Sequence, residues 1–239
     1  MTNQALARRL FAEFLGSAFL AAVVIGSGIA AQRLSPGNTG LELLENAAAT
    51  AAGLFALILM VGPVSGAHFN PAVTLADAIE HGIPWAEVPV YIVAQCVGGV
   101  LGTILAHLMF GLHWYSLSSH VRSGWSLTLS EFIATFGLLS VIWGCSRTRS
   151  GATPFAVASY IVAAYWFTAS TSFANPAVTI ARALSDTFAG IRMADVPSFV
   201  AAQIAGALVA TYLFAWLVPG LQKEAPEVVV PYHANDLRE

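Results

Sequence analysis

Charged side chains are scarce in this sequence. Asp, Glu, Lys and Arg make up 10% of its 239 residues, whereas an ordinary soluble domain carries about 25%. The charges are also clustered, which leaves charge-free stretches at residues 14–32, 46–76, 88–121, 132–146, 150–181 and 196–222. Because a membrane-spanning helix needs about 20 mostly apolar residues, this scarcity excludes a soluble domain and predicts an integral membrane protein.

Cysteine and clusters of reactive side chains are also scarce. Cys96 and Cys145, the two cysteines, both fall in apolar stretches, where lone cysteines are more often packing residues than a disulfide or a metal pair. No Ser/His, paired-Asp or metal-ligand cluster occurs at membrane depth, so the sequence predicts no catalytic or metal-binding residue and argues against an intramembrane enzyme. The net charge of −3, without a basic run, gives no sign of nucleic-acid binding.

The sequence does contain an internal duplication. AEFLGSAFL (12–20) resembles SEFIATFGL (130–138), NPAVTLADAI (70–79) resembles NPAVTIARAL (175–184), and EVPVYIVAQ (87–95) resembles DVPSFVAAQ (195–203). The offsets are 118, 105 and 108 residues, so only the loop lengths differ. The duplication predicts one domain over 1–239, with repeat one at about 8–110, repeat two at about 127–219 and a short tail at 220–239.

Each repeat contains three expected spans, at about 8–32, 43–63, 86–110, 127–147, 152–171 and 195–219. Arg8 and Arg9 before the first apolar run could also begin a secretory signal. That run is too long and contains Glu13, so we interpret it as a span. Since three is odd, the second repeat enters the membrane from the opposite side. Such inverted repeats commonly place the substrate path at the interface between them.

The positive residues favour a cytoplasmic location for both termini. In that orientation six would lie inside, namely Arg8, Arg9, Arg147, Arg149, Lys223 and Arg238. Four would lie outside, namely Arg33, Arg122, Arg182 and Arg192.

Two short apolar pieces, 65–79 and 170–184, each contain the sequence Asn-Pro-Ala-Val-Thr. Asn is a favoured helix cap, and Pro is well tolerated at the first helical position. Each piece should therefore enter as irregular backbone and return as a half-helix, an arrangement tolerated only where it is buried in protein or lines a wet cavity. The two N-termini would meet near the midplane, where their partial positive charges exclude cations and Asn70 and Asn175 can donate to a neutral molecule.

Together these features resemble the aquaporin family, also called major intrinsic proteins. The likeness rests on SGAHFNPAVT (65–74), the second Asn-Pro-Ala (175–177) and the paired Glu and Gln, and it extends at least from Ala12 to Gln203. It implies an all-α membrane protein: a right-handed bundle of six transmembrane helices plus two re-entrant half-helices. It also implies a homotetramer in the lipid bilayer, passive flux of small neutral solutes and no cofactor.

The resemblance also assigns roles to individual residues. The midplane motif would comprise Asn70, Pro71, Ala72, Asn175, Pro176 and Ala177. Structural polar support for the loops would come from Glu13, Glu131, Gln95 and Gln203. His68 would either line the inner vestibule or pack within its loop.

The second motif departs from the family pattern at Val178. In water and glycerol channels that resemble this chain, an Arg at this position forms the outer constriction. Counting from the motifs places Thr50, Ala163 and Ser172 at the other constriction positions. Four small side chains predict a wide opening without an aromatic or charged group. Arg182, one turn beyond Val178, either restores a positive field in the vestibule or forms a surface pair with Asp186.

A bacterial subgroup linked to arsenic-resistance operons also carries Val in place of that Arg. By that resemblance the solutes would be arsenite, as uncharged arsenous acid, and methylated arsenicals, together with glycerol-like solutes and water. The expected location is the bacterial inner membrane. Two alternatives remain open: a general water and small-solute channel, and a coupled carrier, which inverted repeats also build. A carrier would need a titratable residue on the pathway.

Overall fold

The computed structural model describes residues 3–148 and 150–218, and the regular secondary structure in that part of the chain is helical. Six long or medium helices are α1 (Asn3–Leu34), α2 (Thr39–Ser65), α4 (Val88–Met109), α5 (Trp125–Thr148), α6 (Thr153–Phe167) and α8 (Val196–Leu217). Two short ones are α3 (Pro71–Ile79) and α7 (Pro176–Arg182), and single 3-10 turns occupy Trp85–Glu87, Ser150–Ala152 and Met193–Asp195. The expected tail at 220–239, with Lys223 and Arg238, lies outside the described residues, as does Arg149.

Five of these helices are long and apolar enough to cross a membrane, and the all-α membrane fold expected from the sequence is confirmed. The sixth expected span is shorter than predicted. Helix α6 has 15 residues, or about 22 Å at 1.5 Å per residue, against a hydrocarbon core of about 30 Å. It ends at Phe167 because the backbone of Thr168 turns to an extended conformation. The chain then continues as the irregular segment that leads to α7.

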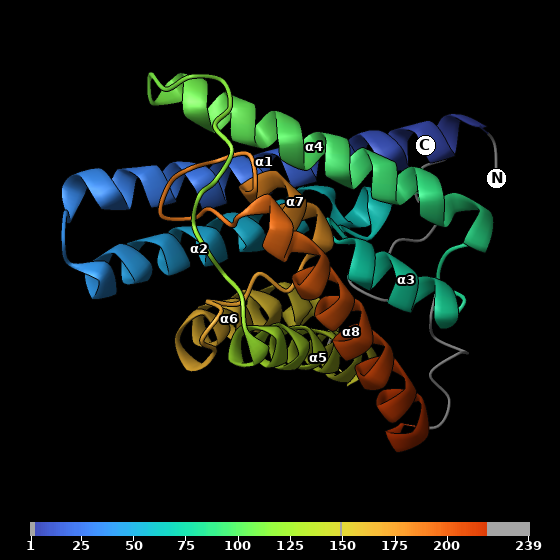
Figure 1. The fold of residues 1–239 in the computed structure, drawn as a ribbon. Coiled ribbons are helices and arrows are strands. Elements are labelled where there is room, and N and C mark those ends of the chain that lie inside the picture. Colours follow the sequence, from blue (N-terminus) through green and yellow to red (C-terminus); the bar gives the residue numbers. More distant parts are fainter. Residues whose placement is uncertain (1–2, 149, 219–239) are drawn as a thin grey trace.

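The two repeats pack their helices in the same way. Helix α1 lies along α4, and α5 lies along α8 (Figure 1). Each pair meets at a glycine: a Cβ on Gly98 would collide with the Phe14 carbonyl oxygen, and a Cβ on Gly206 with the Phe132 carbonyl oxygen. Because the two glycines and the two phenylalanines occupy equivalent positions in the repeats, the close helix crossing is duplicated together with the sequence.

Each half-helix begins at its Asn-Pro pair. The Oδ1 atom of Asn70 accepts a hydrogen bond from the Ala72 amide, and that of Asn175 accepts one from the Ala177 amide, both at 2.9 Å. Pro occupies the first position of both helices, where its missing N–H removes no helical bond. At 9 and 7 residues, α3 and α7 are about 14 and 11 Å long, so neither can cross the membrane alone.

Candidate functional site

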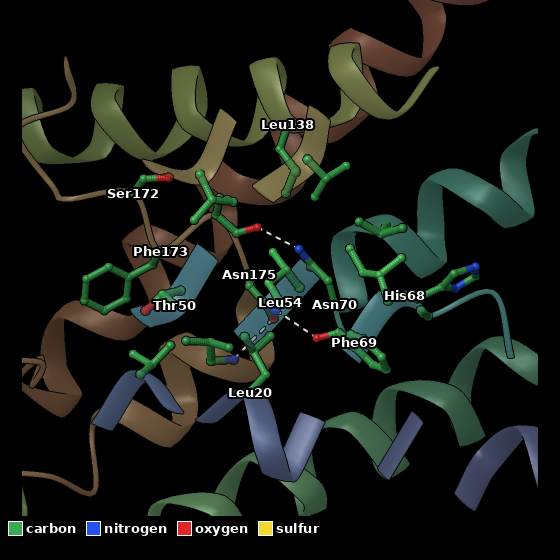
Figure 2. Close-up of a pocket in the computed structure, with 18 of the residues that line it drawn as sticks. Leu20, Thr50, Leu54, His68, Phe69, Asn70, Leu138, Ser172, Phe173 and Asn175 are labelled. Carbon is green, nitrogen blue, oxygen red and sulfur yellow. Dashed lines mark hydrogen bonds between the residues drawn. The ribbon is translucent and has the colours of Figure 1, made fainter. Parts of the chain in front are cut away.

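A cavity of about 60 Å³ lies between the two repeats. Its apolar wall comes from both repeats, and consists mainly of Leu20, Val24, Leu54, Ile58, Val73, Leu138, Ile142, Val157 and Ile161. Its polar side chains belong to Thr50, His68, Asn70, Tyr165, Ser172, Asn175 and Arg182. In Figure 2, Asn70 and Asn175 lie between His68 at one end and Thr50, Ser172 and Phe173 at the other. No carboxylate is among the lining residues.

At the centre the two asparagines connect the repeats crosswise. Asn70 Nδ2 donates to the Ala174 carbonyl at 2.7 Å, and Asn175 Nδ2 donates to the Phe69 carbonyl at 2.8 Å (Figure 2). Each Oδ1 is already used to cap its own half-helix. Since an amide nitrogen carries two hydrogens, each asparagine retains one donor for a molecule in the cavity.

Buried glutamates hold the irregular segments in front of both half-helices. In repeat two, Glu131 accepts hydrogen bonds from the amides of Phe173 and Ala174, both at 2.9 Å, and from Gln203 Nε2 at 2.6 Å. Gln203 also donates to Thr179 at 2.9 Å.

Repeat one has the same arrangement. Glu13 accepts from the amides of His68 and Phe69 at 3.0 and 2.7 Å, and from Gln95 Nε2 at 2.7 Å. Gln95 likewise donates to Thr74 at 2.9 Å. Neither glutamate lines the cavity, so both act on the pore through the backbone they hold.

One end of the cavity is bounded by His68. Its Nδ1 lies 3.2 Å from Thr74 Oγ1, and its Nε2 lies 3.6 Å from Asp77 Oδ2. The ring is thus tied to α3 by two contacts while its edge remains part of the cavity wall. Both roles considered from the sequence, lining and loop packing, coexist in this geometry.

The other end contains three of the four expected constriction residues. Thr50, Ser172 and Val178 line the cavity, but Ala163 does not and is exposed on α6. Tyr165 lines it instead, and its hydroxyl donates to Thr50 Oγ1 at 3.3 Å. The count from Asn175 assumes an α6 that continues toward the motif. Ala163 and Tyr165 both lie within α6, and the packing of this helix turns Tyr165 toward the cavity and Ala163 to the exposed side.

The sequence predicts an opening without an aromatic or charged group, but this end of the cavity contains both. Phe173 and Arg182 both line it. The Arg182 guanidinium carbon lies 3.3 Å from the centroid of the Phe173 ring, and Arg182 Nε donates to the Ala189 carbonyl. The expected alternative pair with Asp186 does not form, since Arg182 is buried and Asp186 accepts from the Ser119 amide and hydroxyl at 2.8 and 2.9 Å.

A second arginine, Arg122 in the loop between the repeats, also lies beside the Phe173 ring. The Arg122 guanidinium carbon lies 5.0 Å from the Phe173 centroid. Burial lowers the pKa of Arg122 to about 10, so the side chain still carries its charge at neutral pH. In the same loop, the Ser119 amide and hydroxyl lower the pKa of Asp186, which keeps that carboxylate ionised and the loop attached to the chain after α7.

The geometry can be compared with known proteins at this point. The profile of the Major intrinsic protein family matches residues 1–167, well over half of the chain. The chain belongs to the major intrinsic protein family. The resemblance inferred from the sequence is confirmed. The chain is accordingly a multi-pass membrane protein and a passive channel for small solutes, not an enzyme.

Individual relatives agree with this assignment. The aquaglyceroporin AqpS of Rhizobium meliloti is 46% identical over 226 residues, which cover 93% of this chain and 97% of that protein. A glycerol uptake facilitator of Streptococcus pneumoniae is 32% identical over 171 residues, covering 64% of this chain and 71% of that one. The X-ray structure of the aquaglyceroporin from Plasmodium falciparum shares the fold with a TM-score of 0.67 at 19% identity, over 91% of this chain and 99% of that chain.

Three residues of this major intrinsic protein's outer end were missed by sequence reasoning. The count from Asn175 points to Ala163 and so misses Tyr165, and nothing in the sequence separates Phe173 from an ordinary core phenylalanine. Arg122 did leave a signal, because it is the one charged residue between Glu87 and Glu131. Within the described residues, no group of three or more His, Cys, Asp or Glu side chains is placed to hold a metal ion.

Proposed function

We propose that this channel conducts small uncharged solutes rich in hydroxyl groups: glycerol-like polyols, water, and arsenite as arsenous acid, with methylated arsenicals in the same class. One observation carries the proposal. Val178 lies on the cavity wall in the first turn of α7, where water and glycerol channels of the family place an arginine. Valine is smaller than arginine and lacks its five donors, so it leaves room for a solute with a polar group on every side.

The remaining polar groups suit such a solute. Asn70 and Asn175 each offer a donor at mid-pore. At the outer end, Ser172 Oγ is buried without a hydrogen-bond partner among the described residues. Arsenous acid carries three hydroxyl groups and is close in shape to a small polyol. Hydrogen-bond donors spaced along an otherwise apolar wall can therefore replace the water molecules that hydrate it. The names of the relatives, an aquaglyceroporin and a glycerol facilitator, support the polyol part of the proposal.

Val178→Arg tests the proposal directly. In stopped-flow assays on proteoliposomes, we expect the wild type to pass water, glycerol, arsenite and the uncharged methylarsonous acid. The arginine should lower glycerol and arsenite permeability by about tenfold or more, equivalent to about 1.4 kcal/mol of barrier, and lower water permeability less. Val178→Met, which adds length without charge, separates steric narrowing from the effect of the guanidinium.

Equal permeability of all solutes in wild type and Val178→Arg would refute the proposed role of Val178. Glycerol flux without arsenite flux in the wild type would leave the general water and small-solute channel as the function. Saturable, gradient-driven accumulation would favour the coupled carrier instead.

Arg182 is proposed as the source of a positive field in the outer vestibule. It is 2% exposed, lines the cavity and forms no salt bridge among the described residues. Its Nε has a carbonyl partner, whereas no partner within the described residues is found for its two terminal nitrogens. A guanidinium in this position repels cations and can donate to a solute hydroxyl.

We expect Arg182→Ala to raise cation leak severalfold, measured as a shift of the reversal potential in planar bilayers. Arg182→Lys, which keeps the charge, should retain the wild-type potential. An Arg182→Ala channel with unchanged flux and ion selectivity would remove Arg182 from the selectivity mechanism.

We also propose the assembly and location that family membership suggests: a homotetramer with one pore per subunit, in the bacterial inner membrane, with both termini cytoplasmic.

A further inference from the structure

Arg122 ties together the chain on both sides of the second half-helix. Its Nη1 donates to the Ser170 carbonyl at 3.3 Å, in the segment that enters α7. Its Nε donates to the Gly190 carbonyl at 2.7 Å and its Nη2 to the Phe188 carbonyl at 3.3 Å, in the segment that leaves α7. The Arg122 amide donates to Asp195 at 2.8 Å. Arg122, in the loop between the repeats, thus holds together the two segments that flank α7 at the outer mouth.

In the first repeat, a different donor binds the carbonyl of the segment that enters the half-helix. Ser65, the equivalent of Ser170, presents its carbonyl to the hydroxyl of Tyr91 at 3.4 Å. The residue of repeat two equivalent to Tyr91 is Phe199, which has no hydroxyl and packs its ring against Phe173 with centroids 5.2 Å apart. Arg122 supplies the donor that repeat two lacks, and supplies it as a full positive charge.

The segment that Arg122 holds is also the more strained of the two. Thr171, Ser172 and Ala174 all have positive φ, at 63°, 48° and 48°. In repeat one the first of the three equivalent positions is Gly66, for which such a backbone is unstrained. A strained segment persists only where its surroundings hold it. Glu131 holds the amides of this segment from within the bundle, and Arg122 holds its carbonyl from the outer loop.

The clamp acts on the pore through Phe173. Arg122 and Arg182 both lie against this ring, at 5.0 and 3.3 Å, and the ring lines the cavity beside Ser172. Arg122 is itself 8% exposed and has no salt-bridge partner among the described residues. Because its guanidinium forms no ion pair within the described part of the chain, its charge adds to that of Arg182 at the outer mouth.

We propose that Arg122 is a selectivity-determining positioning residue of the outer mouth: its fork of three carbonyl bonds fixes Phe173 and so sets the size of solute admitted, and its charge raises the barrier to cations. The loop between the repeats is then part of the selectivity filter. This inference rests on the passive channel activity of the family, not on an arsenical substrate.

The test compares Arg122→Lys and Arg122→Gln in proteoliposomes, with glycerol and the larger polyol erythritol as solutes and sodium conductance as the ion readout. Lysine keeps the charge but cannot reach three carbonyls with one ammonium group. We expect it to raise the erythritol-to-glycerol permeability ratio severalfold without added sodium leak. Glutamine should raise both the ratio and the sodium leak. Arg33→Gln is the matched control, because it removes an exposed arginine that donates to the Phe110 carbonyl and not to a partner of Arg122. It should change neither the ratio nor the sodium leak.

Normalising to the amount of intact protein, measured by gel filtration in detergent, separates misfolding from selectivity. If both variants lower glycerol and erythritol flux in proportion and add no sodium leak, Arg122 is merely structural and the proposal fails. If lysine matches wild type in size ratio, the positioning role fails and only the charge role stands. Arsenite is not used, so failure of the arsenical proposal leaves this result unaffected.

Discussion

At the scale of single residues, each re-entrant segment depends on one buried carboxylate. Glu131 accepts from the amides of Phe173 and Ala174 and from Gln203. Glu13 accepts the equivalent bonds and a further one from the Ser65 hydroxyl at 2.7 Å. A carboxyl group inside a membrane protein is costly unless it is fully bonded. Apart from the bonds from Gln95 and Gln203, the bonds of both glutamates lead to the loops that carry the half-helices. The glutamates therefore stabilise the shape of the cavity and do not line it.

Glu131→Gln is therefore expected to destabilise the protein. The amide keeps one acceptor and turns the other into a donor, so at least one buried N–H of Phe173 or Ala174 loses its partner, at a cost of about 1–3 kcal/mol. Thermal unfolding in detergent should show a lower midpoint, and glycerol flux should fall only as intact protein is lost. Glu13→Gln is the matched variant in repeat one. An unchanged midpoint with altered flux per intact channel would instead place Glu131 in the conduction mechanism.

At the scale of elements, most of the fold could be predicted because its signals are local. Hydrophobic length indicated the spans, Asn-Pro indicated where α3 and α7 begin, and the repeat offsets aligned the two halves. Each half-helix begins where its motif predicts, at Pro71 and Pro176. These features depend on residues close together in the sequence.

The errors come from an element whose end depends on the tertiary structure. Helix α6 ends at Phe167 because the next residues must form the segment held by Glu131 and Arg122, and no breaker in the span itself marks that point. The face that α6 turns toward the cavity also depends on tertiary packing, which places Tyr165 on the cavity wall and Ala163 on the exposed side. Arg122 could not be assigned from sequence for the same reason, since its three carbonyl partners lie 48 to 68 positions away.

At the scale of the whole molecule, the sequence repeat is symmetric but the charges are not. Apart from the glutamate that supports the loop, the buried charged residues near α3 are Asp77, Glu80 and Arg9, and Arg9 is bound to the half-buried Glu87 at 2.8 Å. Near α7 they are the arginines Arg122 and Arg182, together with Asp195, which accepts from the Arg122 amide at 2.8 Å. The backbone and its glutamate supports are duplicated, while the two mouths have diverged in charge. Which of the two mouths an incoming solute meets first therefore depends on the orientation of the chain in the membrane.

The path of the chain makes the orientation testable. Because α4 crosses the membrane once, the turn before α4 and the loop between the repeats lie on opposite sides of the membrane. An even number of crossings, α6 included, puts both termini on the same side. We expect Ser123→Cys, in the loop that carries Arg122, to react with an impermeant maleimide added to intact spheroplasts. Ala86→Cys, beside α4, should react only after permeabilisation. Both sites are exposed, and both variants need Cys96 and Cys145 replaced by alanine so that the new thiol alone is labelled. The reverse labelling pattern would put both termini outside and the arginine-rich mouth in the cytoplasm, and the charge barrier proposed for entry would then act on exit.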